Sequence, residues 1–235
     1  MEKIEHSYLI INDLRLHIAL VGKGEYGDVI LLHGFPEIWY SWRYQMLALA
    51  EAGFRAIAPD CRGYGLSGQP PELEKASWED LTNDLLGILD TLNIPKAFLV
   101  GKDFGIKPAN EFSILHPDRV LGVITLNVPF SPISRSLDSL PKGFYVPRWQ
   151  EPGRAEKDFG RFEVKRVVRN IYILFCGNEL QVAEEDQEIM DLVEPSTLLP
   201  PWLTEDDLAA YAALYENSGF SYPLQMPYRS VPEEV

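Results

Sequence analysis

The chain begins with short apolar runs separated by turn residues. Tyr8–Ile11 and Leu14–Val21 flank Asn12 and Asp13, which predicts two strands paired as a hairpin. Along the second run apolar and other residues alternate, so we expect one of its faces to be buried. His17 falls on the polar face of that run, which predicts a structural or solvent-facing side chain.

Further apolar runs alternate with helical segments. We expect strands over Val29–Leu32, Arg55–Asp60, 97–100 and Val120–Val128, and helices over Ser41–Ala52 and from Ser77, with Asp80 as its capping partner, through Leu92. A hairpin followed by alternating strands and helices predicts an α/β fold, a mostly parallel sheet with helices on both faces. Right-handed crossovers would bring the carboxyl ends of the parallel strands, and the loops that follow them, to one rim.

One of those loops carries the sequence Gly101-Lys102-Asp103-Phe104-Gly105, between the strand 97–100 and a helical pattern that starts at Ile106. The two glycines stand where a nucleophile elbow needs them, because a Cβ at either position would crowd the sharp turn. A carboxylate with a reference pKa of roughly 3.9 needs no base to become a nucleophile, and a helix N-terminus favours its charge. Asp103 is therefore a candidate nucleophile; the plainer alternative is an Asp that caps the following helix.

The pattern changes after Val128. From Phe130 to about Gly160 the chain is rich in Pro, Ser and Gly, and two helical patterns follow. We expect one helix from about Ala155 to Leu174 and another from Thr204, with Asp207 three residues on, to Gly219. This predicts an α/β core over residues 1–129 and an inserted helical cap over residues 130–235.

Composition narrows the function without assigning it. The 235 residues carry a formal net charge of -14, which argues against binding to nucleic acid or to an anionic membrane surface. No apolar stretch approaches the length of a membrane span, and the first residues lack the pattern of a secretory signal, so we expect a cytoplasmic protein. Cys61 and Cys176 are interpreted as free thiols, and we expect no metal site and no cofactor.

Five motifs in a fixed order support a resemblance. They are His33-Gly34-Phe35-Pro36 with Trp42 downstream, Asp60–Ser67, Gly101–Gly105, Asn127–Phe130 and Trp149–Gly153. With them the chain resembles, over essentially its whole length, the soluble epoxide hydrolases of the plant type within the α/β-hydrolase superfamily. The resemblance implies that Asp103 attacks a small lipophilic epoxide and forms an alkyl-enzyme ester, which water then hydrolyses to a vicinal diol.

The resemblance also implies the partners of Asp103. Tyr145 and Tyr228 match two cap tyrosines that hydrogen-bond the epoxide oxygen, a task that suits a phenol because its ring packs on an apolar substrate. The backbone N–H groups of Phe35 and Phe104 match the oxyanion hole. His33 belongs to the same oxyanion loop, and a cis bond before Pro36 would turn that loop toward the site.

Departures from the family pattern bear on activity. The family usually carries His before the nucleophile and Trp after it, where this chain has Lys102 and Phe104. The second half-reaction needs a His, oriented by an acid, to activate water. In the family this base lies after the cap, but no His follows His116 here. We therefore expect a C-terminally truncated form that lacks the acid, the base and the last strands.

Two other functions stay open. The missing base favours a non-catalytic relative that binds a small ligand, while Asp103 and the two tyrosines favour an epoxide hydrolase. A haloalkane dehalogenase would keep the same nucleophile, but it would want an indole N–H where Phe104 stands. The sequence leaves the natural substrate, the regioselectivity and the oligomeric state undetermined.

Overall fold

The computed structural model describes residues 3–126, 140–177 and 181–230. The motif Asn127–Phe130 and the predicted boundary between core and cap at residue 129 lie outside these residues.

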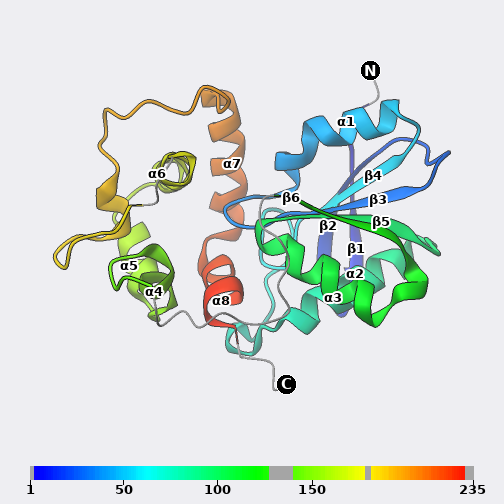
Figure 1. The fold of residues 1–235 in the computed structure, drawn as a ribbon, viewed down its shortest axis with the longest axis horizontal. Helices are drawn as coiled ribbons and strands as arrows, with labels where there is room; N and C mark the ends of the chain where they lie inside the picture. Colours follow the sequence, from blue (N-terminus) through cyan, green and yellow to red (C-terminus); the bar gives the residue numbers. More distant parts are fainter. Residues whose placement is uncertain (1–2, 127–139, 178–180, 231–235) are drawn as a thin grey trace.

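A six-stranded sheet occupies the N-terminal half of the described chain (Figure 1). In spatial order its strands are β1 (Glu5–Ile11), β2 (Leu14–Val21), β4 (Arg55–Pro59), β3 (Asp28–Leu32), β5 (Ala97–Lys102) and β6 (Val120–Leu126). β2 pairs antiparallel with β1 and with β4, whereas β4, β3, β5 and β6 run parallel. The predicted hairpin and the mostly parallel sheet are thus confirmed.

Helices cover both faces of this sheet: α1 (Arg43–Glu51) lies on one face, and α2 (Trp78–Thr91) and α3 (Ile106–Leu115) lie on the other (Figure 1). Alternate residues of β3 show why. Val29 and Leu31 are buried in one apolar cluster with Met46 of α1. Ile30 is buried in a second cluster with Phe112 of α3. Each such side chain contributes roughly 1.5–3 kcal/mol by leaving water, so a strand apolar on both faces recruits helices to both.

One sequence prediction about β2 is wrong. The alternation along this strand predicted a single buried face, but four consecutive residues, Leu16 to Ala19, are all buried. β1 and β4 flank β2, so it is an interior strand covered on both faces. His17 is fully buried and bonded through Nδ1 to Asp60 Oδ2 at 2.9 Å, so its role is structural and it does not face solvent.

Five helices form a separate layer beside the carboxyl ends of the parallel strands (Figure 1). They are α4 (Tyr145–Gln150), α5 (Arg154–Phe159), α6 (Val164–Cys176), α7 (Glu205–Ser218) and α8 (Ser221–Arg229). Short 3-10 turns also occur, at Trp39–Trp42, Leu73–Lys75, Asp103–Gly105, Pro117–Arg119 and Ile189–Leu192. We call α4 to α8 the helical layer.

The capping signals located two helices correctly. Ser77 with Asp80 opens α2, and Thr204 with Asp207 opens α7, each as a reciprocal capping box. Gly219 ends α7 at a φ of 68°, in the left-handed region that favours glycine.

The single helix expected over residues 155–174 is wrong, because the structure has two helices there. α5 ends at Gly160, and Glu163 is extended before α6 begins. Glycine weakens helix propagation, and the Asp158 carboxylate accepts from Arg161 and from the Met190 N–H, which fixes the chain at this break.

The sequence patterns also missed α4 and α8. Pro147 and Pro223 stand in the first turns of these helices, where a missing N–H costs little. Pro227 lies near the end of α8. Proline is rare in helix interiors, so these stretches show no helical pattern in the sequence, and it is the packing of this layer that makes them helical. No described helix has the length and apolar character needed to cross a membrane.

Candidate active site

Asp103 occupies a sharp turn between β5 and α3. Its φ of 52° is unusual for a residue other than glycine. A Cβ on Gly101 would lie 2.6 Å from the Gly105 carbonyl oxygen, and one on Gly105 would lie 2.3 Å from that of Leu32. The flanking glycines are therefore required by close backbone approach, as the elbow motif predicts. The side chain of Asp103 makes no capping bond to α3, so the plainer alternative does not describe it.

The backbone around the turn holds the Asp103 carboxylate. The Phe35 N–H donates to Asp103 Oδ1 at 3.0 Å, and the Phe104 N–H also donates to this carboxylate. The bond between Phe35 and Pro36 is cis, as the resemblance implied. A Cβ on Gly34 would lie 2.1 Å from Asp103 Oδ1, so this loop approaches the carboxylate closely. Both predicted oxyanion donors thus lie beside the nucleophile.

Burial raises the pKa of Asp103 above its ordinary value. The N–H groups of Phe35 and Phe104 oppose this shift, because they stabilise the charged form. Glu37 raises this pKa further and Lys102 lowers it. A partly desolvated carboxylate held by two backbone donors is a nucleophile with little water to displace.

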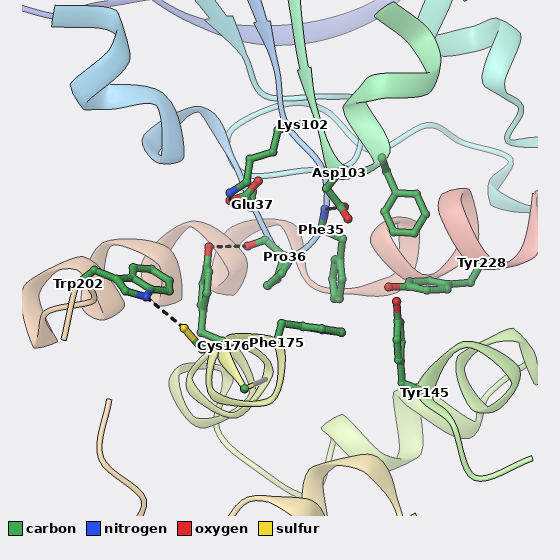
Figure 2. Close-up of a pocket in the computed structure, with 13 residues that line it drawn as sticks. Phe35, Pro36, Glu37, Lys102, Asp103, Tyr145, Phe175, Cys176, Trp202 and Tyr228 are labelled. Carbon is green, nitrogen blue, oxygen red and sulfur yellow. Dashed lines mark hydrogen bonds and ion pairs between the residues drawn. The ribbon is translucent and has the colours of Figure 1, made fainter. Parts of the chain in front are cut away.

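A cavity of about 420 Å³ opens in front of Asp103, between the sheet and the helical layer (Figure 2). Its lining is Phe35, Pro36, Glu37, Lys102, Asp103, Phe104, Tyr145, Tyr172, Phe175, Cys176, Gly177, Trp202 and Tyr228. Six of the predicted site residues are in this set. Aromatic rings dominate the wall, which suits an apolar substrate body.

The two tyrosines come from the first and the last helix of the helical layer in chain order, and these two helices pack against each other. Tyr145 starts α4 and Tyr228 lies in the last turn of α8. Figure 2 shows their hydroxyl groups pointing toward each other below the Asp103 carboxylate, and their ring centroids are 6.2 Å apart. Burial, with the Asp103 charge adding to it, raises the pKa of Tyr145 to about 12. Burial likewise raises the pKa of Tyr228, so both hydroxyls keep their protons at neutral pH.

Arg229 joins the helices that carry the two tyrosines. Its Nε donates to the Trp149 carbonyl oxygen of α4 at 2.7 Å, and its other nitrogens form a bidentate pair with Glu156 of α5. The Trp149 ring packs 5.0 Å from that of Tyr145 and 5.2 Å from that of Tyr228. Arg229 and Trp149 therefore fix the relative position of the two hydroxyls.

Of the predicted site residues, His33 alone does not line the cavity. It is buried, with Nδ1–H donating to the Gly34 carbonyl oxygen and Nε2 accepting from the Cys61 N–H, both at 2.9 Å. These bonds tie the oxyanion loop to the loop after β4. His33 therefore stabilises the loop that carries Phe35, and it does not line the cavity.

None of the four histidines lines the cavity. His6 and His17 lie in the hairpin, where their rings stack with centroids 5.1 Å apart. His116 follows α3 and packs against Phe112. The described cavity residues thus include no imidazole that could act as a base on Asp103.

Sequence reasoning missed the far side of the cavity. Glu37 pairs with Lys102, and Trp202 Nε1 donates to Cys176 Sγ at 3.1 Å (Figure 2). Tyr172 donates to the Pro36 carbonyl oxygen at 3.5 Å. Glu37 directly follows the His33–Pro36 motif, which was the one available signal for it. Tyr172 and Cys176 lie at the end of α6 and Trp202 lies in a loop before α7, and no motif in the sequence assigned these residues to a site.

Comparisons with known proteins agree with this geometry. Residues 28–171 match the model of the family described as alpha/beta hydrolase fold, so the chain is of the α/β-hydrolase class. Epoxide hydrolase 2 of Siraitia grosvenorii is 38% identical over 228 residues, covering 94% of this chain and 71% of that protein. Bifunctional epoxide hydrolase 2 of Sus scrofa is 35% identical, covering 97% of this chain and 42% of that protein.

Solved structures give the same result. A mutant of the Vigna radiata epoxide hydrolase superposes with a TM-score of 0.85 at 35% identity, covering 95% of this chain and 72% of that one. A mutant of potato epoxide hydrolase superposes with a TM-score of 0.85 at 32% sequence identity, covering 98% of this chain and 74% of that one. The chain belongs to the epoxide hydrolases of the α/β-hydrolase fold.

Proposed function

We propose that the protein opens small lipophilic epoxides through an ester on Asp103. The observation that carries this proposal is the set of groups that meet at one aromatic cavity. They are a buried carboxylate, two backbone N–H donors and two protonated tyrosine hydroxyls. Ring opening needs a nucleophile on carbon and a donor on oxygen at the same time, and this arrangement supplies both.

In the first step Asp103 Oδ2 attacks an epoxide carbon while Oδ1 stays bonded to the Phe35 N–H. A C–O bond of the ring breaks, and its electron pair goes to the epoxide oxygen. Tyr145 and Tyr228 donate to that oxygen as its charge develops, and one of them gives it a proton. The product is a hydroxyalkyl ester of Asp103 and one tyrosinate.

In the second step water attacks the ester carbonyl carbon. The negative charge that forms on the carbonyl oxygen is stabilised by the N–H groups of Phe35 and Phe104. The bond from that carbon to the diol oxygen then breaks, and one proton of the water goes to that oxygen. The other proton of the water returns to the tyrosinate, and the diol leaves Asp103 as a carboxylate. This step needs a base, and no histidine of the 235 residues lines the cavity. For this chain by itself we therefore propose that the ester accumulates.

We further propose the division into an α/β core over residues 1–129 and a helical cap over 130–235. The helical layer supports it, since α4 to α8 place Tyr145 and Tyr228 over Asp103 while the sheet supplies the nucleophile. Epoxide and water are the partners that this chemistry requires.

The haloalkane dehalogenase alternative is less well supported. Phe104 offers no indole N–H beside the nucleophile, whereas two phenols at the opposite wall suit an oxygen atom rather than a halide. The ligand-binder alternative leaves the buried charge of Asp103 without a purpose, because burying a carboxylate costs stability.

The test is intact mass spectrometry of the chain after incubation with trans-stilbene oxide. We expect a gain of one epoxide mass, mapping to Asp103 after proteolysis. Asp103→Asn, with the amide verified by mass, should show no adduct. An adduct elsewhere, or one that persists in this variant, contradicts the nucleophile. Release of diol over many turnovers contradicts the proposed accumulation of the ester.

A further inference from the structure

The cavity contains an ion pair that the reaction above does not use. Lys102 Nζ pairs with Glu37 Oε1, and both residues line the cavity (Figure 2). The Glu37 side chain is 8% exposed, whereas that of Lys102 is 40% exposed. The carboxylate is thus enclosed and the ammonium is accessible from the cavity.

This pair lies close to the reacting carboxylate. Lys102 directly precedes Asp103, and the charges of Lys102 and Glu37 both act on the Asp103 carboxylate. Figure 2 shows the pair and the two tyrosine hydroxyls on different sides of Asp103. A substrate with its epoxide oxygen at the tyrosines therefore extends a neighbouring substituent toward Lys102 and Glu37.

The hydrogen-bonding capacity of the pair is only partly used. An ammonium has three N–H donors, and among the described residues Lys102 Nζ donates to Glu37. Glu37 Oε2 is buried and accepts no hydrogen bond from the described residues. A buried acceptor without a donor costs free energy, so a group that donates to it would be favoured.

The charges of the pair select among substituents. An alkyl group would cover the ammonium without replacing the hydrogen bonds of water. A carboxylate would bond Lys102 but would meet the negative charge of Glu37. A hydroxyl is neutral, accepts from the ammonium and donates to a carboxylate, so it matches both members.

We propose that Lys102 and Glu37 form a subsite for a hydroxyl group borne on the carbon next to the epoxide, so that epoxy alcohols are the preferred substrates. This inference rests on the proposed function, because it assumes that Asp103 opens the epoxide in this cavity.

Three probes that differ in one substituent test the subsite. They are trans-1-phenylpropylene oxide, trans-3-phenylglycidol and trans-3-phenylglycidate, which carry a methyl, a hydroxymethyl and a carboxylate group. The measurement is the second-order rate constant of adduct formation on the full chain, followed by intact mass. The intrinsic reactivities of the probes differ, so the quantity to compare is the ratio of their rate constants in each variant.

Lys102→Met should lower the ratio of alcohol to hydrocarbon rate constants by roughly tenfold, the worth of one hydrogen bond to a charged group. Glu37→Gln removes the negative charge and keeps an oxygen for Lys102, so it should raise the ratio of carboxylate to alcohol by a similar factor. Lys165→Met is the matched control, because Lys165 is a half-exposed lysine paired with Glu205 outside the cavity. It should change neither ratio.

The outcomes separate the two proposals. If the hydrocarbon probe reacts and Lys102→Met leaves the alcohol ratio unchanged, the subsite is refuted and the proposed function stands. If the carboxylate probe gains most from Lys102 in the unaltered chain, the subsite binds anions and the hydroxyl assignment is wrong. If no probe forms an adduct on the folded chain, both proposals fail. Near-ultraviolet circular dichroism verifies the fold of each variant. If Lys102→Met does not fold, the result for Glu37→Gln decides the test.

Discussion

At the scale of single residues, the proposed chemistry depends on pairing a buried acceptor with buried donors. Burial raises the pKa of Asp103, while two backbone N–H groups stabilise its charged form. Tyr145 and Tyr228 have their pKa raised, so they remain donors at neutral pH. The same low-dielectric surroundings that penalise the carboxylate thus keep the phenols protonated, and these are the protonation states that ring opening needs.

The tyrosine hydroxyls give a prediction at this scale. Tyr145→Phe and Tyr228→Phe should each slow alkylation of Asp103, because an oxyanion-type donor is worth on the order of 10²-fold in rate and two donors share the task. The double variant should be slower than either single one. Single-turnover adduct formation measures this. Tyr26→Phe, at a 70% exposed tyrosine away from the cavity, is the matched control. Unchanged rates in both single variants and the double variant would make the tyrosines packing residues.

At the scale of elements, the helices that carry Tyr145 and Tyr228 are short and need a connection. α4 has 6 residues and α8 has 9, too few for stability in isolation. Arg229 supplies a link, since it bonds a carbonyl oxygen of α4 and a carboxylate of α5 from the end of α8. The placement of the two hydroxyls therefore depends on this guanidinium as well as on the packing of Trp149 against both tyrosines.

Arg229→Gln should consequently slow alkylation while the sheet stays folded. Small displacements of reacting groups cost up to about 10²-fold in rate, and we expect a loss below that limit. Arg229→Lys should recover part of the loss, because it restores a charge but not the bidentate geometry. Arg161→Gln is the control, since Arg161 also pairs with two carboxylates, Asp158 and Asp191, but does not touch the tyrosine helices. Equal rates for Arg229→Gln and Arg161→Gln would show that the link is not needed for the reaction.

At the scale of the whole molecule, β6 is the last strand of the sheet in the described chain. Its Leu121, Ile124 and Leu126 side chains are 50%, 52% and 39% exposed. Ile114 and Leu115 at the end of α3 are also exposed, at 66% and 62%. A parallel strand is normally covered on both faces, so this edge offers apolar side chains together with unpaired backbone groups.

We therefore predict that the 235-residue chain associates with itself through β6. Light scattering coupled to size-exclusion chromatography should show an average mass that rises with protein concentration. Ile124→Lys should reduce the association, because a charge on an edge strand opposes pairing. Leu198→Lys is the control, since Leu198 is 87% exposed but lies outside the sheet. A monomer at all concentrations would contradict the prediction, as would an equal effect of the two lysine variants.

The sequence determined the features that local rules control. The hairpin, the parallel strands, the capping boxes of α2 and α7 and the elbow at Asp103 follow from periodicity, from short-range hydrogen bonds and from glycine at crowded positions. The order of the five motifs also identified the family, because members of a family keep their motifs in the same order along the chain. These signals are contained within a few neighbouring residues, so they can be interpreted without knowing where the rest of the chain lies.

Only the tertiary structure decided which distant residues meet. Burial of His17 on an interior strand, the break between α5 and α6 and the helical state of α4 and α8 all depend on packing partners remote in sequence. The pairing of Lys102 with Glu37, 65 positions apart, is of the same kind. The cavity exists because α4, α6 and α8 fold back over the carboxyl ends of the strands. Contacts between remote segments depend on how whole surfaces fit, and local periodicity carries no record of that fit.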